Sequence, residues 1–223
     1  AYVFGYAGTN WDRQDTLTAG DAPANAFFGR SVAISGDTIV VGAVGAAYVF
    51  VRSGTRWIQQ TTFTDNASAS FGSVVAVSGD TVVVESQNDN TVHVFRRNGT
   101  NWTQEAVLAG RRPAIDGDTL VLERTISAPN SIEYVSAVYV RAGAGWIEQA
   151  QFDGVSPTIS GNTLALLDYL NSVVQVFVRS GTSWTPQAQF EGHSPVISGD
   201  LLAVRTPSLS QLDFHPGVHV YGG

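Results

Sequence analysis

The chain alternates short apolar runs with turn-forming residues, and its apolar positions recur at a spacing of two rather than at helical spacing. The clearest pattern surrounds a Gly-x-x-Trp turn. This turn occurs five times, with tryptophans 46, 45, 44 and 38 residues apart at Trp11, Trp57, Trp102, Trp146 and Trp184. Six residues after each stands a large apolar side chain: Leu17, Phe63, Leu108, Phe152 or Phe190. The even spacing predicts that each tryptophan opens a β-strand with one buried face.

A second phrase, Ser-Gly-Asp-Thr or a close variant, also occurs five times. The copies begin at Ser35, Ser78, Asp116, Ser160 and Ser198. An apolar run precedes each copy and another follows it, as SVAI and IVVGA do around the first. Two apolar runs joined by Gly-Asp or Gly-Asn predict a tight β-hairpin. A third run, AYVF or a variant, stands before each Gly-x-x-Trp turn, so each repeat holds four strands.

Five repeats of four short strands predict an all-β protein: a five-bladed β-propeller of four-stranded antiparallel blades, forming a single domain over residues 1–223. A β-sandwich also has many short strands, but it would not place the same side chains at the same offsets five times. The AYVF-type strand occurs six times, and these copies include one at each end of the sequence. We therefore expect the N- and C-terminal strands to share one blade, with residues 1–4 in its third position and residues 218–221 as an extra strand.

Composition excludes several classes of site and partner. The formal net charge of −7 argues against a nucleic-acid partner, because phosphate binding needs a basic surface. The absence of cysteine excludes disulfides, zinc–thiolate sites and thiol nucleophiles. No apolar run approaches the roughly 18 residues that cross a bilayer, so we expect no membrane insertion.

One stretch carries a resemblance to a known family. Residues 26–57, AFFGRSVAISGDTIVVGAVGAAYVFVRSGTRW, resemble an FG-GAP repeat, the unit of the integrin-α-type β-propeller. Phe28-Gly29 matches the FG, Val41-Gly42-Ala43 matches most of the GAP, and Phe71-Gly72 is a second FG. Later repeats lose the FG, and a Gly-x-x-Pro link replaces it near Pro113, Pro157 and Pro195.

The resemblance does not extend to metal binding. Integrin-type repeats often bind Ca²⁺ in a D-x-D-x-D-G loop between their first and second strands. Here that loop is only Ser-Gly-Asp, which is too short to supply six or more oxygen ligands. We therefore expect no calcium, no other metal and no cofactor. We interpret the aspartate of the phrase (Asp37, Asp80, Asp118, Asp200) as a turn residue that bonds its own backbone.

The connections between strands differ in how much they vary. In a four-stranded blade, the constant Ser-Gly-Asp and Gly-x-x-Trp turns lie on one face, and the remaining connections, which are variable, lie on the other. Variable loops on a repeated scaffold are where binding usually occurs, so we expect a ligand there. The candidate ligand-binding residues on this face are Glu85, Asn88, Asp89, Glu123, Arg124, Tyr134, Asp168, Tyr169, His193, Arg205 and His215.

Charged residues at the ends of the second strands allow three interpretations. Glu85, Glu123, Arg124, Asp168 and Arg205 occupy these positions, where they should ring the channel mouth. They could pair between neighbouring blades, form a polar recognition pocket, or act as catalytic carboxylates, which must converge in a cleft. The tryptophans are interpreted as packing residues, with sugar stacking as the alternative. His93 and His219 are predicted to point out of the core into solvent.

No enzyme motif is present: the chain has no G-x-S-x-G elbow, H-E-x-x-H helix, phosphate loop or dinucleotide fingerprint. We therefore predict a non-enzymatic recognition protein. The preferred form is a secreted, extracellular or cell-surface lectin-like propeller that binds a glycan or glycoprotein through repeated shallow sites. A protein-binding or adhesion propeller is the alternative, and a glycan-cleaving enzyme is the third possibility. The oligomeric state stays open.

Overall fold

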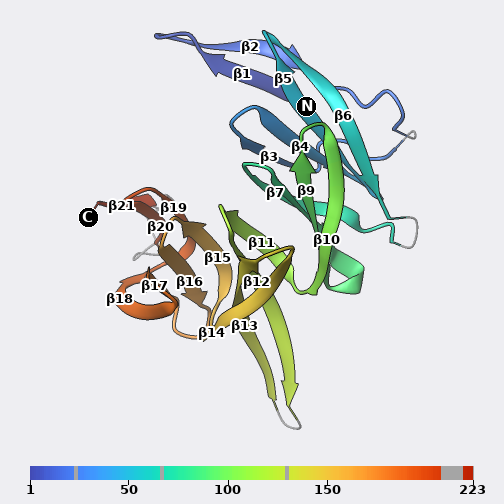
Figure 1. Ribbon diagram of the computed structural model, residues 1–223. Coiled ribbons are helices and arrows are strands. Elements are labelled where there is room, and N and C mark those ends of the chain that lie inside the picture. The colour runs from blue at the N-terminus through green and yellow to red at the C-terminus, as the bar shows by residue number, and fades with distance from the viewer. Residues whose placement is uncertain (23–24, 66–67, 129–130, 207–217, 223) are drawn as a thin grey trace. The chain divides into compact units, whose positions relative to one another are not determined.

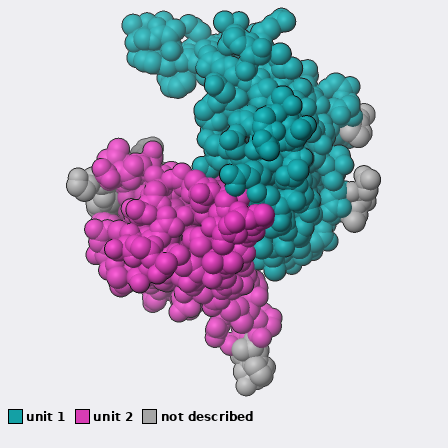
Figure 2. Space-filling model, viewed as in Figure 1, with its two compact units in different colours: residues 1–111 teal, residues 112–223 magenta. Residues whose placement is uncertain are grey.

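The computed structural model describes residues 1–22, 25–65, 68–128, 131–206 and 218–222, and these form antiparallel β-sheets throughout (Figure 1). In this part of the chain the single helical element is a 3-10 turn, η1 (Gln87–Asp89), and no helix is long and apolar enough to cross a membrane. The chain divides into two compact units, Ala1–Arg111 and Arg112–Gly223, which Figure 2 distinguishes by colour.

Unit 1 holds a two-stranded sheet and two four-stranded sheets. The two-stranded sheet pairs β1 (Tyr2–Tyr6) with β2 (Trp11–Thr16). The first four-stranded sheet has the order β3 (Ser31–Ser35), β4 (Thr38–Ala43), β5 (Ala46–Ser53), β6 (Arg56–Thr64). The second has the order β7 (Phe71–Ser78), β8 (Thr81–Ser86), β9 (Thr91–Asn98), β10 (Asn101–Ala109).

Unit 2 holds two four-stranded sheets and one three-stranded sheet. The first has the order β11 (Arg111–Asp116), β12 (Thr119–Ala128), β13 (Ser131–Ala142), β14 (Gly145–Asp153). The second has the order β15 (Val155–Ser160), β16 (Thr163–Asp168), β17 (Val173–Ser180), β18 (Ser183–Glu191). The third has the order β19 (His193–Ser198), β20 (Leu201–Arg205), β21 (Val218–Gly222).

The four-stranded antiparallel sheets confirm the predicted blade, strand for strand. The number of blades and the single domain stay predictions. The expected place of residues 1–4 is wrong: β21 holds the third position beside β20, pairing Val220 with Ala203, whereas β1 pairs with β2. The short chain between β20 and β21 explains this choice, because a short connection closes at a smaller entropic cost than a distant segment does.

The core consists of layers of side chains between successive sheets. Every residue of β4 and β8 is buried, because a second strand is covered by the neighbouring sheets on both of its faces. Aromatic rings join the outer strands. Phe63 of β6 stacks on Phe95 of β9 with 3.8 Å between ring centroids, and Trp102 of β10 meets the edge of Phe63. The period-two pattern after each tryptophan therefore does mark a buried face.

The glycines of the FG and GAP phrases let two backbones approach closely. Gly72 has φ +85°, and a Cβ on it would lie 2.2 Å from the carbonyl oxygen of Ala46. A Cβ on Gly42 would lie 2.2 Å from the carbonyl oxygen of Gly72. Only glycine fits at these two positions, so the FG and GAP glycines allow neighbouring sheets to pack closely.

Candidate functional site

The variable connection between the second and third strands of a sheet is hydrogen-bonded, backbone to backbone, to the link that leads to the next sheet. The amide of Gly154 donates to the carbonyl oxygen of Tyr134 (3.3 Å), and the amide of Gly192 donates to that of Ser172 (2.9 Å). In unit 1 the amide of Gly110 donates to Asn90 in the same way (2.8 Å). In these three sheets the bonds place both kinds of connection on the same face, as the sequence predicts.

Glu123 joins two neighbouring sheets. Its carboxylate is 1% exposed and accepts a hydrogen bond from Nη1 of Arg112 (3.1 Å) and another from the backbone amide of Ser156 in the next sheet (3.2 Å). Arg112 and Ser156 both have positive φ, at 49° and 53°. The ion pair with Arg112 lies within one sheet, between β11 and β12, and the contact with the neighbouring sheet is the backbone bond from Ser156, so the predicted pairing of charges between blades stays a prediction. A buried carboxylate is stable in such a place because its partners replace the lost water.

Arg124, the next residue, belongs to a surface network on its own sheet. Its guanidinium donates two parallel hydrogen bonds to Glu148 (2.9 and 3.0 Å), one to Gln151 (2.7 Å) and one to the hydroxyl of Tyr139 (3.2 Å). The pKa of Tyr139 is raised, chiefly because burial penalises its charged form. The two parallel hydrogen bonds to Glu148 hold the Arg124 side chain against β13 and β14.

Asp168 organises the turn between β16 and β17. Its Oδ1 accepts hydrogen bonds from the amides of Leu170 and Asn171 (3.1 Å each), and its Oδ2 accepts one from the Asn171 side chain (2.7 Å). The Asn171 side-chain bond is the main reason that the pKa of Asp168 is lowered. The turn presents Tyr169 and Leu170 to solvent, with exposed fractions of 73% and 91%.

In unit 1, Asp89 belongs to a cluster of serine hydroxyls. The Ser86 hydroxyl donates to Oδ2 of Asp89 (2.6 Å), and the Ser68 and Ser70 hydroxyls complete the cluster. The Ser68 hydroxyl is the main cause of the lowered pKa of Asp89, followed by that of Ser86. The backbone amide of Asn88 also donates to Ser70 (2.8 Å). The cluster therefore ties the η1 turn to the start of β7.

The remaining candidates lie apart from these networks. Glu85 is buried and lies 3.3 Å from the hydroxyl of Ser73. His193 and Arg205 are paired across β19 and β20, Tyr134 is 50% exposed on β13, and His215 lies outside the described residues. The structure brings Glu123 beside Arg112, a residue that was not predicted. The ligand-binding role of all these residues stays a prediction.

His93 differs from expectation. Its side chain is 13% exposed, its ring meets the edge of Phe71, and its Nε2 lies 3.8 Å from a carboxylate oxygen of Asp65. The prediction of a solvated side chain is wrong here, because Asp65 and Phe71 lie against the His93 ring. His219 lies on β21, whose side chains are not described.

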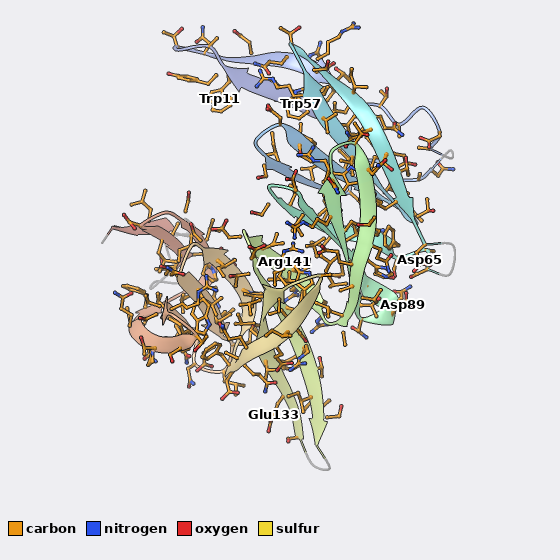
Figure 3. The ribbon with its side chains drawn as sticks, viewed as in Figure 1. Trp11, Trp57, Asp65, Asp89, Glu133 and Arg141 are labelled. Atoms are coloured by element: carbon orange, nitrogen blue, oxygen red, sulfur yellow. The ribbon has the colours of Figure 1, made fainter. Side chains whose placement is uncertain are left out.

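The opposite face carries a repeated stack of three side chains. Nε of Arg141 donates to Oδ1 of Asp118 (2.7 Å), and the guanidinium lies 4.5 Å from the ring centroid of Trp146. Arg97 and Arg179 repeat this arrangement, with Asn162 replacing the aspartate in the latter. Figure 3 labels Arg141. Asp80 and Asp118 of the Ser-Gly-Asp phrase thus bind the arginine of the third strand, and not their own backbone as predicted.

The serine of the same phrase joins one hairpin to the next. The amide of Gly79 donates to Oγ of Ser35 (3.1 Å), and the amide of Gly199 donates to Oγ of Ser160 (3.1 Å). In the intervening position Asp116 accepts from Gly161 (2.5 Å). An oxygen-bearing side chain is therefore needed at the first position of the phrase, which sequence reasoning missed.

In the described part of the chain, no group of three or more His, Asp or Glu side chains is arranged to hold a metal ion.

The interpretation of the tryptophans as packing residues holds for some of them. Trp57 is 9% exposed, and Trp102 and Trp184 pack on phenylalanines of the preceding sheet. Trp11 differs, because it is 69% exposed on the β1–β2 hairpin (Figure 3).

Comparison with known proteins identifies one repeat. Residues 11–55 match the family model of the FG-GAP repeat. The chain contains an FG-GAP repeat. The matched segment includes Phe28-Gly29 and Val41-Gly42-Ala43, the residues that carry the resemblance in the sequence. A search of curated proteins finds no match to the chain.

Solved structures share the fold of this chain at low identity. A candidate 6-phosphogluconolactonase from Bacteroides uniformis is 13% identical, with a TM-score of 0.60 over 99% of this chain and 74% of that one. A second, from Bacteroides fragilis, is 11% identical, with a TM-score of 0.60 over 99% and 73%. A protein from Lactobacillus plantarum is 14% identical, with a TM-score of 0.56 over 88% and 67%. The two candidate lactonases are β-propellers, so the likeness supports the propeller fold.

Proposed function

We propose that this protein is a non-enzymatic recognition propeller that binds another protein through the variable loops of unit 2. One observation carries the proposal. Two of these connections hold large apolar side chains in solvent: Ile132 (63% exposed) and Tyr134 (50%) on the β12–β13 hairpin, and Tyr169 (73%) and Leu170 (91%) between β16 and β17. Large apolar side chains that stand in pairs on an exposed connection, rather than singly, typically mark an interaction site.

The chemistry of these loops fits a protein interface. Tyrosines act as anchors in protein interfaces because a rigid ring buries a large area at a small entropic cost. Leucine and isoleucine, in contrast, gain little from contact with a polar sugar. Glu133, which Figure 3 labels on the hairpin, adds a negative charge beside Ile132 and Tyr134. A partner with an apolar patch and a basic rim would complement this surface.

The turn that carries Tyr169 and Leu170 is ordered before binding. Asp168 and Asn171 fix it through three hydrogen bonds. Preorganisation lowers the entropic cost of association, so a rigid presenting turn favours binding.

Carbohydrate binding is a second candidate, and Tyr169 supports it. This ring is exposed beside the polar side chains of Asp168 and Asn171, an arrangement in which a sugar could stack on the ring and hydrogen-bond at its edge. A secreted or cell-surface location belongs to both versions of the proposal and follows from the resemblance to integrin-type repeats.

The test is a comparison of captured partners. The parent protein and a Tyr169→Ser/Leu170→Ser variant are immobilised, and proteins captured from an extracellular fraction are identified by mass spectrometry. A partner that the parent captures and the variant loses is purified, and direct binding is measured by calorimetry. We expect the double substitution to weaken binding at least tenfold, as loss of interface anchors does.

Matched controls separate the candidates. Val107→Ser removes another apolar side chain, 48% exposed in unit 1, and should leave binding unchanged. Enzymatic removal of glycans from the partner should also leave it unchanged if protein is recognised, and should abolish it if sugar is. Equal capture by parent and double variant would contradict a binding role for these loops.

A further inference from the structure

The arginine of the third strand has an aspartate partner in unit 1 and an asparagine partner in the second sheet of unit 2. In unit 1, Oδ1 of Asp80 accepts a hydrogen bond from Nε of Arg97 (2.8 Å) and lies 2.6 Å from its Nη2. In unit 2, Oδ1 of Asn162 accepts from Nε of Arg179 (3.0 Å), and Nη2 of Arg179 has no hydrogen-bond partner in the described part of the chain. Arg179 therefore lacks the negative charge that Asp80 places beside Arg97.

Three contacts fix the orientation of Arg179. Besides the bond to Asn162, its Nη1 donates to Oγ1 of Thr119 in the neighbouring sheet (2.8 Å), and its guanidinium lies 5.2 Å from the ring centroid of Trp184. Thr119 is buried, so packing holds this acceptor in place. No carboxylate among the described residues forms an ion pair with Arg179. A charged donor is thus held in one orientation, which lowers the entropic cost of binding an anion.

A cavity of about 340 Å³ lies beside this donor, between two successive hairpins of unit 2. The β11–β12 turn contributes Asp116 and Asp118 to its lining, the β15–β16 turn contributes Asn162, and the third strands contribute Arg141 and Arg179. The cavity is open to solvent, because the turn residues Asp118 and Asn162 are exposed. Its volume is at the lower end of the range of about 300–1,000 Å³ for small-molecule sites, which limits the ligand to a small one.

The other charges of the lining determine which anion fits. Asp118 and Arg141 neutralise one another, because Nε of Arg141 donates to Oδ1 of Asp118 (2.7 Å). Oδ2 of Asp116 accepts a bond from the backbone of the β15–β16 turn, whereas its Oδ1 has no partner among the described residues. The groups left to a ligand are two donors, Nη2 of Arg179 and Nδ2 of Asn162, and one acceptor, Oδ1 of Asp116. A ligand that satisfies all three carries an anionic acceptor and a separate donor.

We propose that this cavity binds a small hydroxy acid, such as a sugar acid, through its carboxylate. The carboxylate accepts hydrogen bonds from Nη2 of Arg179 and from the side-chain amide of Asn162, and so replaces the aspartate that Arg97 has. A hydroxyl of the ligand donates to Oδ1 of Asp116. A carboxylate without a hydroxyl would meet Asp116 only as a like charge, and this repulsion selects the hydroxy acid.

This site is independent of the protein-binding loops proposed above. The Ser-Gly-Asp turns that form it lie on the constant face of the sheets, and Tyr169 and Leu170 stand on a variable connection. Loss of binding at one site is therefore expected without loss at the other.

The test is a titration of the full chain with four acids, namely glycerate, gluconate, glucuronate and galacturonate, at constant ionic strength. These probes share a carboxylate with neighbouring hydroxyls and differ in length and stereochemistry. We expect at least one to shift the backbone amide resonances of Gly117 and Gly161, which line the cavity, in a saturable way. Glycerol, glucose and galactose lack the carboxylate, and acetate and glycine lack the hydroxyl. All five should bind roughly tenfold more weakly or worse.

One substitution blocks the site without removing any contact of Arg179. Asn162→Asp supplies an internal carboxylate to Nη2, as Asp80 does to Arg97, so it should weaken acid binding by roughly tenfold or more. Its melting temperature should equal or exceed that of the parent, because an ion pair is added. Asn98→Asp is the matched control, since it adds the same charge at an exposed position of unit 1 and should bind the acid like the parent.

Four results overturn the proposal. The first is the absence of a saturable shift at Gly117 and Gly161 with all four acids. The second is equal or tighter binding of the neutral sugars or glycerol, which would show that the carboxylate is not recognised. The third is equal or tighter binding of glycine or acetate, which would remove the role of the hydroxyl. The fourth is parent-like acid binding by a folded Asn162→Asp variant.

Discussion

The indole nitrogen of Trp184 donates a hydrogen bond to Oε1 of Gln149, across the boundary between two sheets. Trp102 and Gln60 form the same pair in unit 1, with an N–O distance of 2.7 Å. Each glutamine stands three residues after the tryptophan of its own sheet. The phrase Trp-x-x-Gln therefore bonds a sheet to both of its neighbours. Its tryptophan donates a hydrogen bond to the preceding sheet, and its glutamine accepts one from the following sheet.

Loss of this acceptor should destabilise the protein. Gln149→Leu leaves the partly buried indole N–H of Trp184 without its partner, and we expect a loss of about 1–2 kcal/mol in the free energy of unfolding. Urea denaturation followed by tryptophan fluorescence measures it. The matched control is Gln189→Leu on β18, the strand of Trp184, whose side chain is exposed and which should change stability by less than about 0.5 kcal/mol. Equal effects of both substitutions would contradict the pairing.

The Asp–Arg–Trp stack should require arginine. The Arg141 side chain is 7% exposed and contacts Asp118 and Trp146 at once. Lysine keeps the charge but loses the planar donor group, so Arg141→Lys should cost about 1–2 kcal/mol of stability in chemical denaturation. Arg52→Lys is the control, because Arg52 is 43% exposed and its nitrogen lies 4.0 Å from Asp37. That change should be close to neutral.

The close approach at Gly72 should not tolerate a methyl group. Gly72→Ala puts a Cβ within 2.4 Å of the carbonyl oxygens of both Ala43 and Ala46, at φ +85°. Because both neighbours are backbone, we expect a loss of at least about 3 kcal/mol, visible as a lower melting temperature or as insoluble protein. Gly79→Ala also has positive φ, but nothing lies within 4 Å of its new Cβ. It should cost only about 1–2 kcal/mol.

The turn that presents Tyr169 and Leu170 should loosen in acid. Hydrogen bonds, first that of the Asn171 side chain, hold the pKa of Asp168 below its ordinary value of 3.8. The carboxylate's contribution to stability is therefore fully present above that value and is lost as the pH falls through the lower, folded-state pKa. Asn171→Ala should raise the pKa of Asp168 towards 3.8, as measured by NMR titration of the carboxyl carbon. The pKa of Asp89, which depends on Ser68 and Ser86, is the internal control.

Most of the fold could be predicted from the sequence because each repeat shows the alternation of apolar residues and the turn residues that specify strands and hairpins. The apolar runs around Ser35 and Ser78 become β3–β4 and β7–β8, and each turn glycine has the positive φ of a tight hairpin. The place of residues 1–4 could not be predicted, since the sequences of β1 and β21 are copies of one phrase. Chain connectivity favours β21 beside β20, and local pattern carries no such information.

The candidate site was predicted less well. The loops and the charged residues at the strand ends were found, but not their partners. Glu123 bonds Arg112 and Ser156, while the adjacent Arg124 bonds Glu148 on its own sheet. Successive residues of a strand face opposite ways, so their partners depend on what packs on each side. The exposure of Leu170 was missed for the same reason, since the pattern alone does not show which loop residues remain uncovered.

The sequence by itself determined the strands, their order within the four-stranded sheets and the two constant turns. These depend on side-chain alternation and turn residues, which act over a few neighbouring positions. Only the tertiary structure decided that Trp184 reaches Gln149, that Asp118 binds Arg141 and that Gly42 faces Gly72. Those contacts join segments more than 20 residues apart, and they arise because strand pairing within a sheet or the stacking of one sheet on the next brings these segments within bonding distance.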